Sequence, residues 1–188
     1  MADVKEALKD VDVMTQQELK NEILTDFRIA NESREASLIG RREVLTGKAK
    51  FGIFGDGKEL AQIALAKQFQ NGDFRSGYYR DQTWMMSAGL LSLEEFFGQL
   101  YANPDPKADP NSSGRQMNCH FSTHSLDENG NWKNLMSQKN SSSDISPTAG
   151  QMPRLLGLGL ASKIYRNNTL LHTPDFKKFS KKDRKSVV

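Results

Sequence analysis

The feature that most constrains this chain is a long central stretch, residues 102–146, in which no hydrophobic periodicity is present. Three prolines and many Asn and Ser residues interrupt any regular element there. Loops of this length inside a compact domain are usually binding loops or disordered linkers. The run Ser141–Ser143 favours disorder, whereas five large apolar residues favour a loop that docks or folds on something: Met117, Phe121, Trp132, Leu135 and Met136. We interpret the stretch as a binding loop and keep disorder as the alternative.

A long helix is predicted before this stretch. The capping box Thr15–Glu18 marks its start, and Gly47 supplies a stop after a helix of about thirty residues ending near Leu45. The apolar residues that would stack on one face of this helix are Leu19, Ile23, Leu24, Phe27 and Ala30. The pattern therefore predicts an amphipathic helix packed along that face.

Shorter elements follow. Asp56 is placed to cap a second helix that runs through Gln68, and the capping box Ser92–Glu95 predicts a third. Between them, Phe74–Tyr79 is predicted as a strand. After Pro147, residues 148–165 resume a helical pattern, and their many small residues imply that another backbone passes very close. These small residues are Gly150, Gly157, Gly159, Ala161 and Ser162.

Composition limits the classes of protein that are possible. A chain of 188 residues accommodates one ordinary domain or a piece of a larger one. The single cysteine, Cys119, cannot form an internal disulfide or a multi-thiolate metal site. With no apolar run long enough to cross a membrane and no signal peptide, we expect a cytoplasmic protein without membrane contact.

The charge is unevenly distributed. The net charge is +3, and the last twelve residues, 177–188, hold six Lys or Arg against one Asp. This basic tail suggests either a solvated connection or an arm that binds nucleic acid or an acidic protein. Its few aromatic residues make nucleic acid binding the less favoured interpretation. A nonenzymatic binding module therefore remains the alternative function.

One motif has the chemistry of a phosphate site. Tyr78-Tyr79-Arg80-Asp81 places phenols, a guanidinium and a carboxylate at the end of the predicted strand, where ligands commonly bind in α/β folds. A planar guanidinium offers paired donors to an oxyanion, and Asp81 could orient it. Surface clusters of this kind also occur without function, so both interpretations stay open at this point.

Two other motifs are weaker. His120 and His124, beside Cys119, are four residues apart and would meet on a helix, but a helix is doubtful there and no carboxylates accompany them, so no metal-binding residues are assigned. His120 is a better candidate for an acid, base or hydrogen-bond donor, with an ordinary loop histidine as the alternative. Gly55-Asp56-Gly57 superficially resembles a metal–diphosphate motif, but no Asn follows at the required distance.

Three blocks in order along the chain carry a family resemblance. At Gly77-Tyr-Tyr-Arg-Asp81, Gly114-Arg-Gln-Met-Asn-Cys-His120 and Ile145-Ser-Pro-Thr-Ala-Gly-Gln-Met-Pro153, the sequence resembles the alpha subunit of the 2-oxo acid dehydrogenase decarboxylase component. It is most similar to the branched-chain, 2-oxoisovalerate type. Each block alone is weak, but three collinear blocks with matching spacing are specific.

The resemblance implies an α/β thiamine diphosphate-binding fold. Residues 1–188 would be an N-terminal, predominantly helical portion of one such domain, with few short strands and a long loop. In that family the cofactor-binding positions correspond to Tyr79, Arg80, Ser146 and Thr148. Tyr78 would lie on the substrate side, and His120 would be catalytic.

The resemblance also implies cofactors and partners. The cofactors would be thiamine diphosphate, Mg²⁺ held by ligands beyond this chain, and a K⁺ ion near Pro147 and Gly150. The partners would be a beta subunit, or the beta half of a fused chain, and a lipoyl-bearing acyltransferase component, with homo-oligomer formation. Because the family's magnesium motif would follow residue 188, we expect these residues alone to bind the cofactor poorly and not to turn over.

Overall fold

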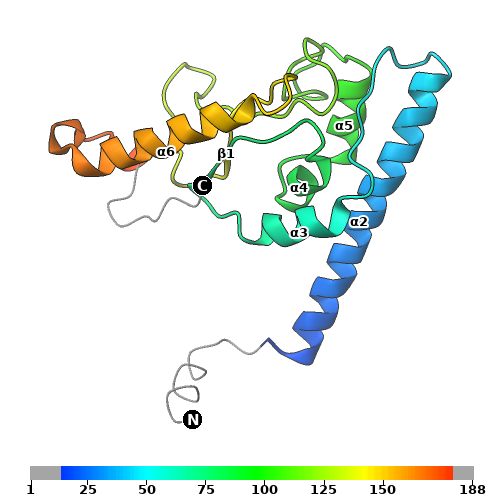
Figure 1. Ribbon diagram of the computed structural model, residues 1–188, viewed down its shortest axis with the longest axis horizontal. Helices are drawn as coiled ribbons and strands as arrows, with labels where there is room; N and C mark the ends of the chain where they lie inside the picture. Colours follow the sequence, from blue (N-terminus) through cyan, green and yellow to red (C-terminus); the bar gives the residue numbers. More distant parts are fainter. Residues whose placement is uncertain (1–13, 180–188) are drawn as a thin grey trace.

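The computed structural model describes residues 14–179 and is mostly helical (Figure 1). The helices are α2 (Gln16–Leu45), α3 (Glu59–Lys67), α4 (Gln82–Ser87), α5 (Leu93–Leu100), α6 (Gln151–Asn167) and α7 (Phe176–Phe179), with the 3-10 turn η1 (Thr169–Leu171). Two short strands, β1 (Phe74–Arg75) and β2 (Asn140–Ser141), pair in parallel. The expected helical portion with few strands and a long loop is confirmed. The complete thiamine diphosphate-binding fold stays a prediction.

Helix α2 begins and ends where the sequence predicts. The Thr15 hydroxyl accepts from the Glu18 amide, and the Glu18 carboxylate accepts from the Thr15 amide, so the capping box is complete. The face that packs differs from the predicted one: the buried residues lie in the second half of the helix and are mostly small, namely Ser33, Ala36, Ser37, Gly40 and Glu43. Leu19, Ile23 and Phe27 remain exposed. Small side chains let α3, α4 and α5 approach the α2 backbone closely, so they form the contact face.

The prediction that Asp56 caps the second helix is wrong. Helix α3 begins at Glu59, and its N-cap residue, Lys58, makes no side-chain capping bond. The Asp56 carboxylate instead accepts from Arg41 at 2.6 Å. The Glu59 carboxylate accepts from the Gly57 amide at 3.0 Å and so satisfies a donor at the start of the helix. Gly57 has φ +92°, and this positive φ turns the chain before α3.

The hydrophobic core lies between α2, α4, α5 and the long loop. Its buried members are Ala36, Met85, Leu91, Phe96, Cys119 and Phe121. Cys119 and Phe121 belong to the long loop, and both side chains are fully buried. The loop therefore contributes two core residues and is packed on the helices rather than disordered.

The predicted strand Phe74–Tyr79 is shorter in the structure. Only Phe74 and Arg75 pair, with Asn140 and Ser141 of the long loop. The Tyr78 carbonyl then accepts from the Asp81 amide at 3.0 Å, so the chain turns into α4, which the sequence interpretation missed. The parallel pairing fixes the end of the long loop beside this turn.

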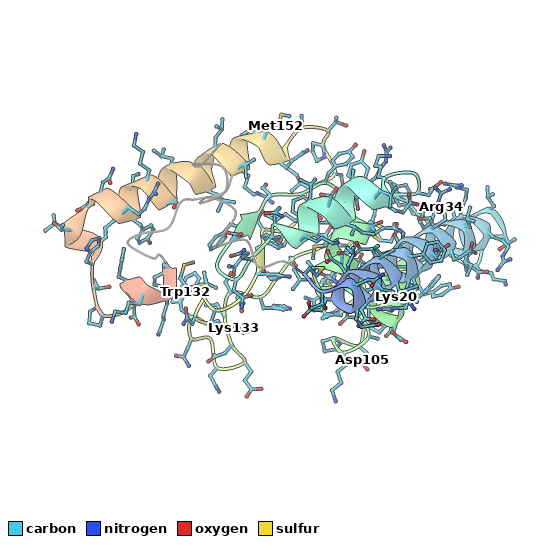
Figure 2. The ribbon with its side chains drawn as sticks, turned by 90° about the horizontal axis from the view of Figure 1, so that it is seen from below. Lys20, Arg34, Asp105, Trp132, Lys133 and Met152 are labelled. Carbon is cyan, nitrogen blue, oxygen red and sulfur yellow. The ribbon has the colours of Figure 1, made fainter. Side chains whose placement is uncertain are left out.

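Helix α6 lies on the far side of the molecule from α2 (Figure 1). The expectation that a backbone packs closely against it is not met within residues 14–179, because none of its residues is buried. A Cβ atom added at Gly157 would meet no heavy atom within 4 Å. After α6 the chain turns back, and Phe179 of α7 packs edge-on against Trp132 of the long loop at 5.3 Å between ring centroids. Figure 2 shows Trp132 beside this last helical segment.

Two expectations concern the ends and the environment of the chain. Most of the predicted basic tail, residues 180–188, lies outside the described residues. Within residues 14–179, no helix combines the length and the apolar character needed to cross a bilayer.

Candidate functional site

The turn between β1 and α4 presents Tyr78, Tyr79 and Arg80. Asp81 closes this turn, because its Oδ2 accepts from the Tyr78 amide at 2.8 Å. The prediction that Asp81 orients Arg80 is wrong: the Asp81 carboxylate forms its ion pair with Arg75 at 2.8 Å. Arg80 is therefore held by other contacts.

Arg80 stacks on aromatic rings and has no anionic partner in the described structure. Its guanidinium carbon lies 5.7 Å from the ring centroid of Tyr78 and 5.5 Å from that of Tyr79. The backbone is fixed below it: the Arg80 carbonyl accepts from Gln62 Nε2 at 2.9 Å. A Cβ atom on Gly55 would come within 2.3 Å of that carbonyl oxygen, so only glycine allows this approach. The half-buried guanidinium is thus placed, positively charged and unpaired, as an anion site requires.

The two phenols interact with each other. The ring centroids of Tyr78 and Tyr79 are 3.9 Å apart, and the Tyr78 hydroxyl donates to the Tyr79 oxygen. Donation to Tyr79, followed by burial, raises the pKa of Tyr78, while a hydrogen bond with the Thr148 hydroxyl acts in the opposite direction. Tyr78 therefore keeps its proton and links the turn to the segment that begins α6.

His120 joins the second and third blocks. Its ring Nδ1 lies 3.2 Å from the Asn118 carbonyl oxygen and its Nε2 lies 2.9 Å from the Ser146 hydroxyl. A carbonyl can only accept, so Nδ1 carries a proton, and in the neutral form of the ring Nε2 would be an acceptor. The ring is only 4% exposed and is nearly parallel to that of Tyr79 at 6.2 Å. The structure therefore brings His120 beside both the tyrosine turn and Ser146.

The segment before α6 contributes exposed hydroxyls and one unpaired oxygen. Ser146 and Thr148 are both exposed, and Ala149 adopts φ +62°. Gln151 was not among the predicted site residues. Its Oε1 is buried without a hydrogen-bond partner, and its carbonyl accepts from the Ser76 hydroxyl at 3.0 Å. Gln151 follows Ser146 and Thr148 in the third of the resembling blocks. Its role could not be predicted from that spacing, because a buried oxygen without a hydrogen-bond partner is recognised only in the folded chain.

The six predicted site residues therefore converge from three separate blocks: Tyr78, Tyr79, Arg80, His120, Ser146 and Thr148. His120 also lines a polar cavity of about 180 Å³, together with residues that include Asn111, Arg115 and Ser143. A larger cavity of about 760 Å³ follows the first turns of α2, and none of these six residues lines it.

The histidines near Cys119 do not converge. His124 Nε2 lies 2.8 Å from the Pro110 carbonyl, away from the bonds that His120 makes. Burial raises the pKa of the Cys119 thiol far above its ordinary value, so the sulfur stays protonated. In the part of the chain that the structure describes, no three His, Cys, Asp or Glu side chains gather as a metal site.

Comparisons with known proteins point in one direction. No protein-family model matches the chain. The chain is similar to the 2-oxoisovalerate dehydrogenase subunit alpha of Bacillus subtilis (strain 168), with 29% identity over 124 residues. The match covers 65% of this chain and 32% of that protein, so the chain spans about a third of the relative's length. This similarity supports the expected relationship to a dehydrogenase alpha subunit. By its name, the Bacillus subtilis protein is one subunit of a larger enzyme.

Proposed function

We propose that this chain is the cofactor-holding part of the alpha subunit of a thiamine diphosphate-dependent 2-oxo acid dehydrogenase, of the branched-chain type. The observation that carries the proposal is the convergence of an unpaired Arg80, stacked on two tyrosines, with His120 and Ser146. The similarity to the Bacillus subtilis alpha subunit supports the same class.

The residues present fit the diphosphate end of this cofactor. Arg80 has no competing carboxylate in the described structure and would pair with phosphate oxygens, and the Tyr79 hydroxyl would donate to one of them. Ser146 and Thr148 would contact the aminopyrimidine side. The orphaned Oε1 of Gln151 suits a K⁺ ion in the same segment, because hard cations take oxygen ligands. Mg²⁺ would be held by ligands that lie beyond these residues.

The protein's own part in the reaction is orientation and proton transfer. Bound thiamine diphosphate would supply the carbon nucleophile for a 2-oxo acid and the electron sink for loss of carbon dioxide. His120 Nε2 is the atom that would take up or give a proton at the substrate oxygen, since Nδ1 is committed to Asn118. Tyr78 would face the substrate and exclude water together with Tyr79. The decarboxylated unit would pass as an acyl group to lipoyl-lysine on an acyltransferase component, and the lipoyl disulfide would take up the two electrons.

The partners follow from the same proposal. A beta subunit, or a beta half of a fused chain, would complete the site, and the assembly would contain more than one copy of this chain. Without that partner, the chain would bind the cofactor weakly and would not turn over. The alternative, a binding module that uses the basic tail, depends mostly on residues outside the described range, and no described contact favours it.

The proposal is tested by cofactor affinity in the chain assembled with its proposed beta partner, because the chain alone is expected to bind the cofactor weakly. Replacing Arg80 with Ala, or Tyr79 with Phe, removes charged or hydroxyl donors to the diphosphate. Because a hydrogen bond to a charged group contributes about 1.5–3 kcal/mol, we expect the affinity for magnesium thiamine diphosphate to fall roughly ten- to hundredfold for Arg80→Ala. Isothermal titration calorimetry measures it.

The matched control is Arg28→Ala. Arg28 pairs with Glu32 on the exposed face of α2, far from the site in the sequence and in its contacts. Its substitution should leave cofactor affinity unchanged. A native assembly that does not bind the cofactor, or an Arg80→Ala assembly that binds it as tightly as the native one, contradicts the proposed function.

A further inference from the structure

Arg75, at the end of β1, joins the segments that carry the candidate site. Its side chain is 1% exposed. Nη1 donates to the Ser141 hydroxyl at 2.7 Å, and the two terminal nitrogens donate to the two oxygens of Asp144 at 3.2 Å each. Nη2 also donates to Asp81 at 2.8 Å and lies 3.3 Å from the Tyr78 carbonyl. One guanidinium therefore connects β1, the turn before α4 and the end of the long loop.

The two carboxylates extend this connection to the site. Asp81 Oδ2 also accepts from the Tyr78 amide at 2.8 Å. Asp144 Oδ2 also accepts from the amide of Phe121, the residue after His120, at 3.2 Å. Each carboxylate thus ties Arg75 to backbone beside a proposed site residue. The distance between the tyrosine turn and His120 depends on both links.

Neighbouring residues pack closely against the Arg75 guanidinium. A Cβ atom on Gly77 would lie 1.8 Å from the Arg75 guanidinium carbon, so glycine is required there. The guanidinium also lies 5.8 Å from the ring centroid of Trp84. Arg75 Nε is buried without a partner, a cost that the four filled terminal N–H groups offset.

The charge balance adds a constraint. Burial raises the pKa of Asp144, and the Arg75 guanidinium opposes that rise. Asp81 and Asp144 together carry two formal negative charges against one positive charge. Loss of Arg75 alone would leave these carboxylates without their cation in a poorly solvated place, which is costly.

We propose that Arg75 is a positioning residue that holds the Tyr78–Arg80 turn at its working distance from His120 through Asp81 and Asp144. This inference rests on the proposed function for its effect on cofactor binding. Arg75 itself lies outside the proposed set of cofactor contacts, so it would act on affinity only through the backbone segments that it joins.

The test separates positioning from mere stability with two variants of the intact protein. Arg75→Lys keeps the charge but loses the planar fork that reaches both carboxylates. Arg75→Met combined with Asp144→Asn removes the bridge while removing one charge of each sign, so the folded state does not gain a further uncompensated carboxylate. Both should remain folded by circular dichroism, and both should bind magnesium thiamine diphosphate at least tenfold more weakly than the native protein.

The matched control is Arg34→Met combined with Glu59→Gln, which removes a partly buried ion pair between α2 and α3. That double variant should keep the native affinity. Folded Arg75→Lys protein with native cofactor affinity would overturn the inference. So would native affinity in the folded protein that carries both Arg75→Met and Asp144→Asn.

A second measurement keeps the inference separate from the proposed function. If the native chain assembled with its beta partner does not bind the cofactor, the proposed function fails, but amide hydrogen exchange still tests positioning. In the Arg75 variants the amides of Tyr78 and Phe121 should exchange at least tenfold faster, while those of α5 keep their native rates. Unchanged exchange at both amides would refute the role of Arg75.

Discussion

Single side chains decide how the candidate site is held. Gln82 is fully buried in α4, and its Nε2 donates to the Ser33 carbonyl and the Ser37 hydroxyl of α2 at 2.9 and 2.8 Å. Its Oε1 accepts from the Gly55 amide at 3.2 Å. Gly55 in turn lies against the Arg80 carbonyl. One amide group therefore fixes α2 and the segment beneath Arg80 to the same helix.

Gln82→Met keeps the volume of this side chain but leaves the Gly55 amide without its acceptor. A buried donor that loses its partner costs about 1–3 kcal/mol, so the free energy of unfolding should fall by that amount. Urea denaturation with an unchanged slope measures it. Gln116→Met, at an exposed position, serves as the control and should change stability by less than about 0.5 kcal/mol. Equal stability of both variants would show that the Gln82 amide is not needed.

At these positions the sequence indicated the candidate groups but not their partners. Tyr79, Arg80, His120 and Ser146 were chosen from their chemistry and from a resemblance, and the structure places them together. No pattern in the sequence marks Arg75 and Gln82 as buried, because an arginine in a short strand and a glutamine in a short helix resemble surface residues. Only burial distinguishes them.

Contacts between helices account for the next level of organisation. The C-terminal part of α2 and the end of α5 are joined by one bond, in which the Tyr101 hydroxyl donates to Glu43 Oε2 at 2.8 Å. This donation is the main cause of a lowered pKa for Glu43, and it raises the pKa of Tyr101. The bond thus favours the ionised carboxylate in the folded chain.

The pH dependence of this contact follows from the direction of the shift. A carboxyl group with a lowered folded-state pKa stabilises the fold above its unfolded value, here 4.5, and this contribution is lost as pH falls through the folded value. Tyr101→Phe should therefore lower the melting temperature near pH 7, and the difference from the native chain should shrink below about pH 4.5.

Thermal unfolding at a series of pH values measures this effect. Tyr165→Phe is the control, because the Tyr165 hydroxyl makes no hydrogen bond in the described structure, and the two chains should melt alike at every pH. A Tyr101→Phe difference that is constant with pH would contradict the assignment to Glu43.

Elements with strong local signals were predicted well. Both capping boxes start helices at the predicted residues, because the capping bonds of Thr15 and Ser92 form within four residues of sequence. Asp56 failed as a cap because a distant arginine, Arg41, binds its carboxylate. The predicted strand that begins at Phe74 was too long, because the turn that ends it depends on the carboxylate of Asp81, which Arg75 also binds.

In the described structure an apolar face of α6 is uncovered, as are the apolar residues in the first half of α2. On α6, residues at intervals of four form an exposed apolar stripe: Met152, Leu156, Leu160 and Ile164. Leu156 is 74% and Leu160 is 58% exposed. Apolar surface of this kind favours association because burying it removes it from water.

We expect the chain of 188 residues to self-associate through such surfaces in a concentration-dependent way. Leu156→Glu should weaken this association and leave the melting temperature unchanged, since the side chain has no buried contact to lose. Lys163→Glu, also exposed on α6, controls for the added negative charge. Sedimentation velocity over a range of concentrations measures both, and equal association of the two variants would exclude the stripe.

Local patterns in the sequence determined that the segments of α2, α3, α5 and α6 are helical, where α2 and α5 begin, and which side chains have the chemistry to bind an anion or transfer a proton. These properties depend on interactions between residues close in the chain or on side-chain chemistry alone. The tertiary structure decided which face of α2 is buried, that the long loop supplies core residues, and that Arg75 and Gln82 are buried and bonded to the segments of the candidate site. Those outcomes depend on contacts between residues dozens of positions apart, for which hydrophobic periodicity contains no information.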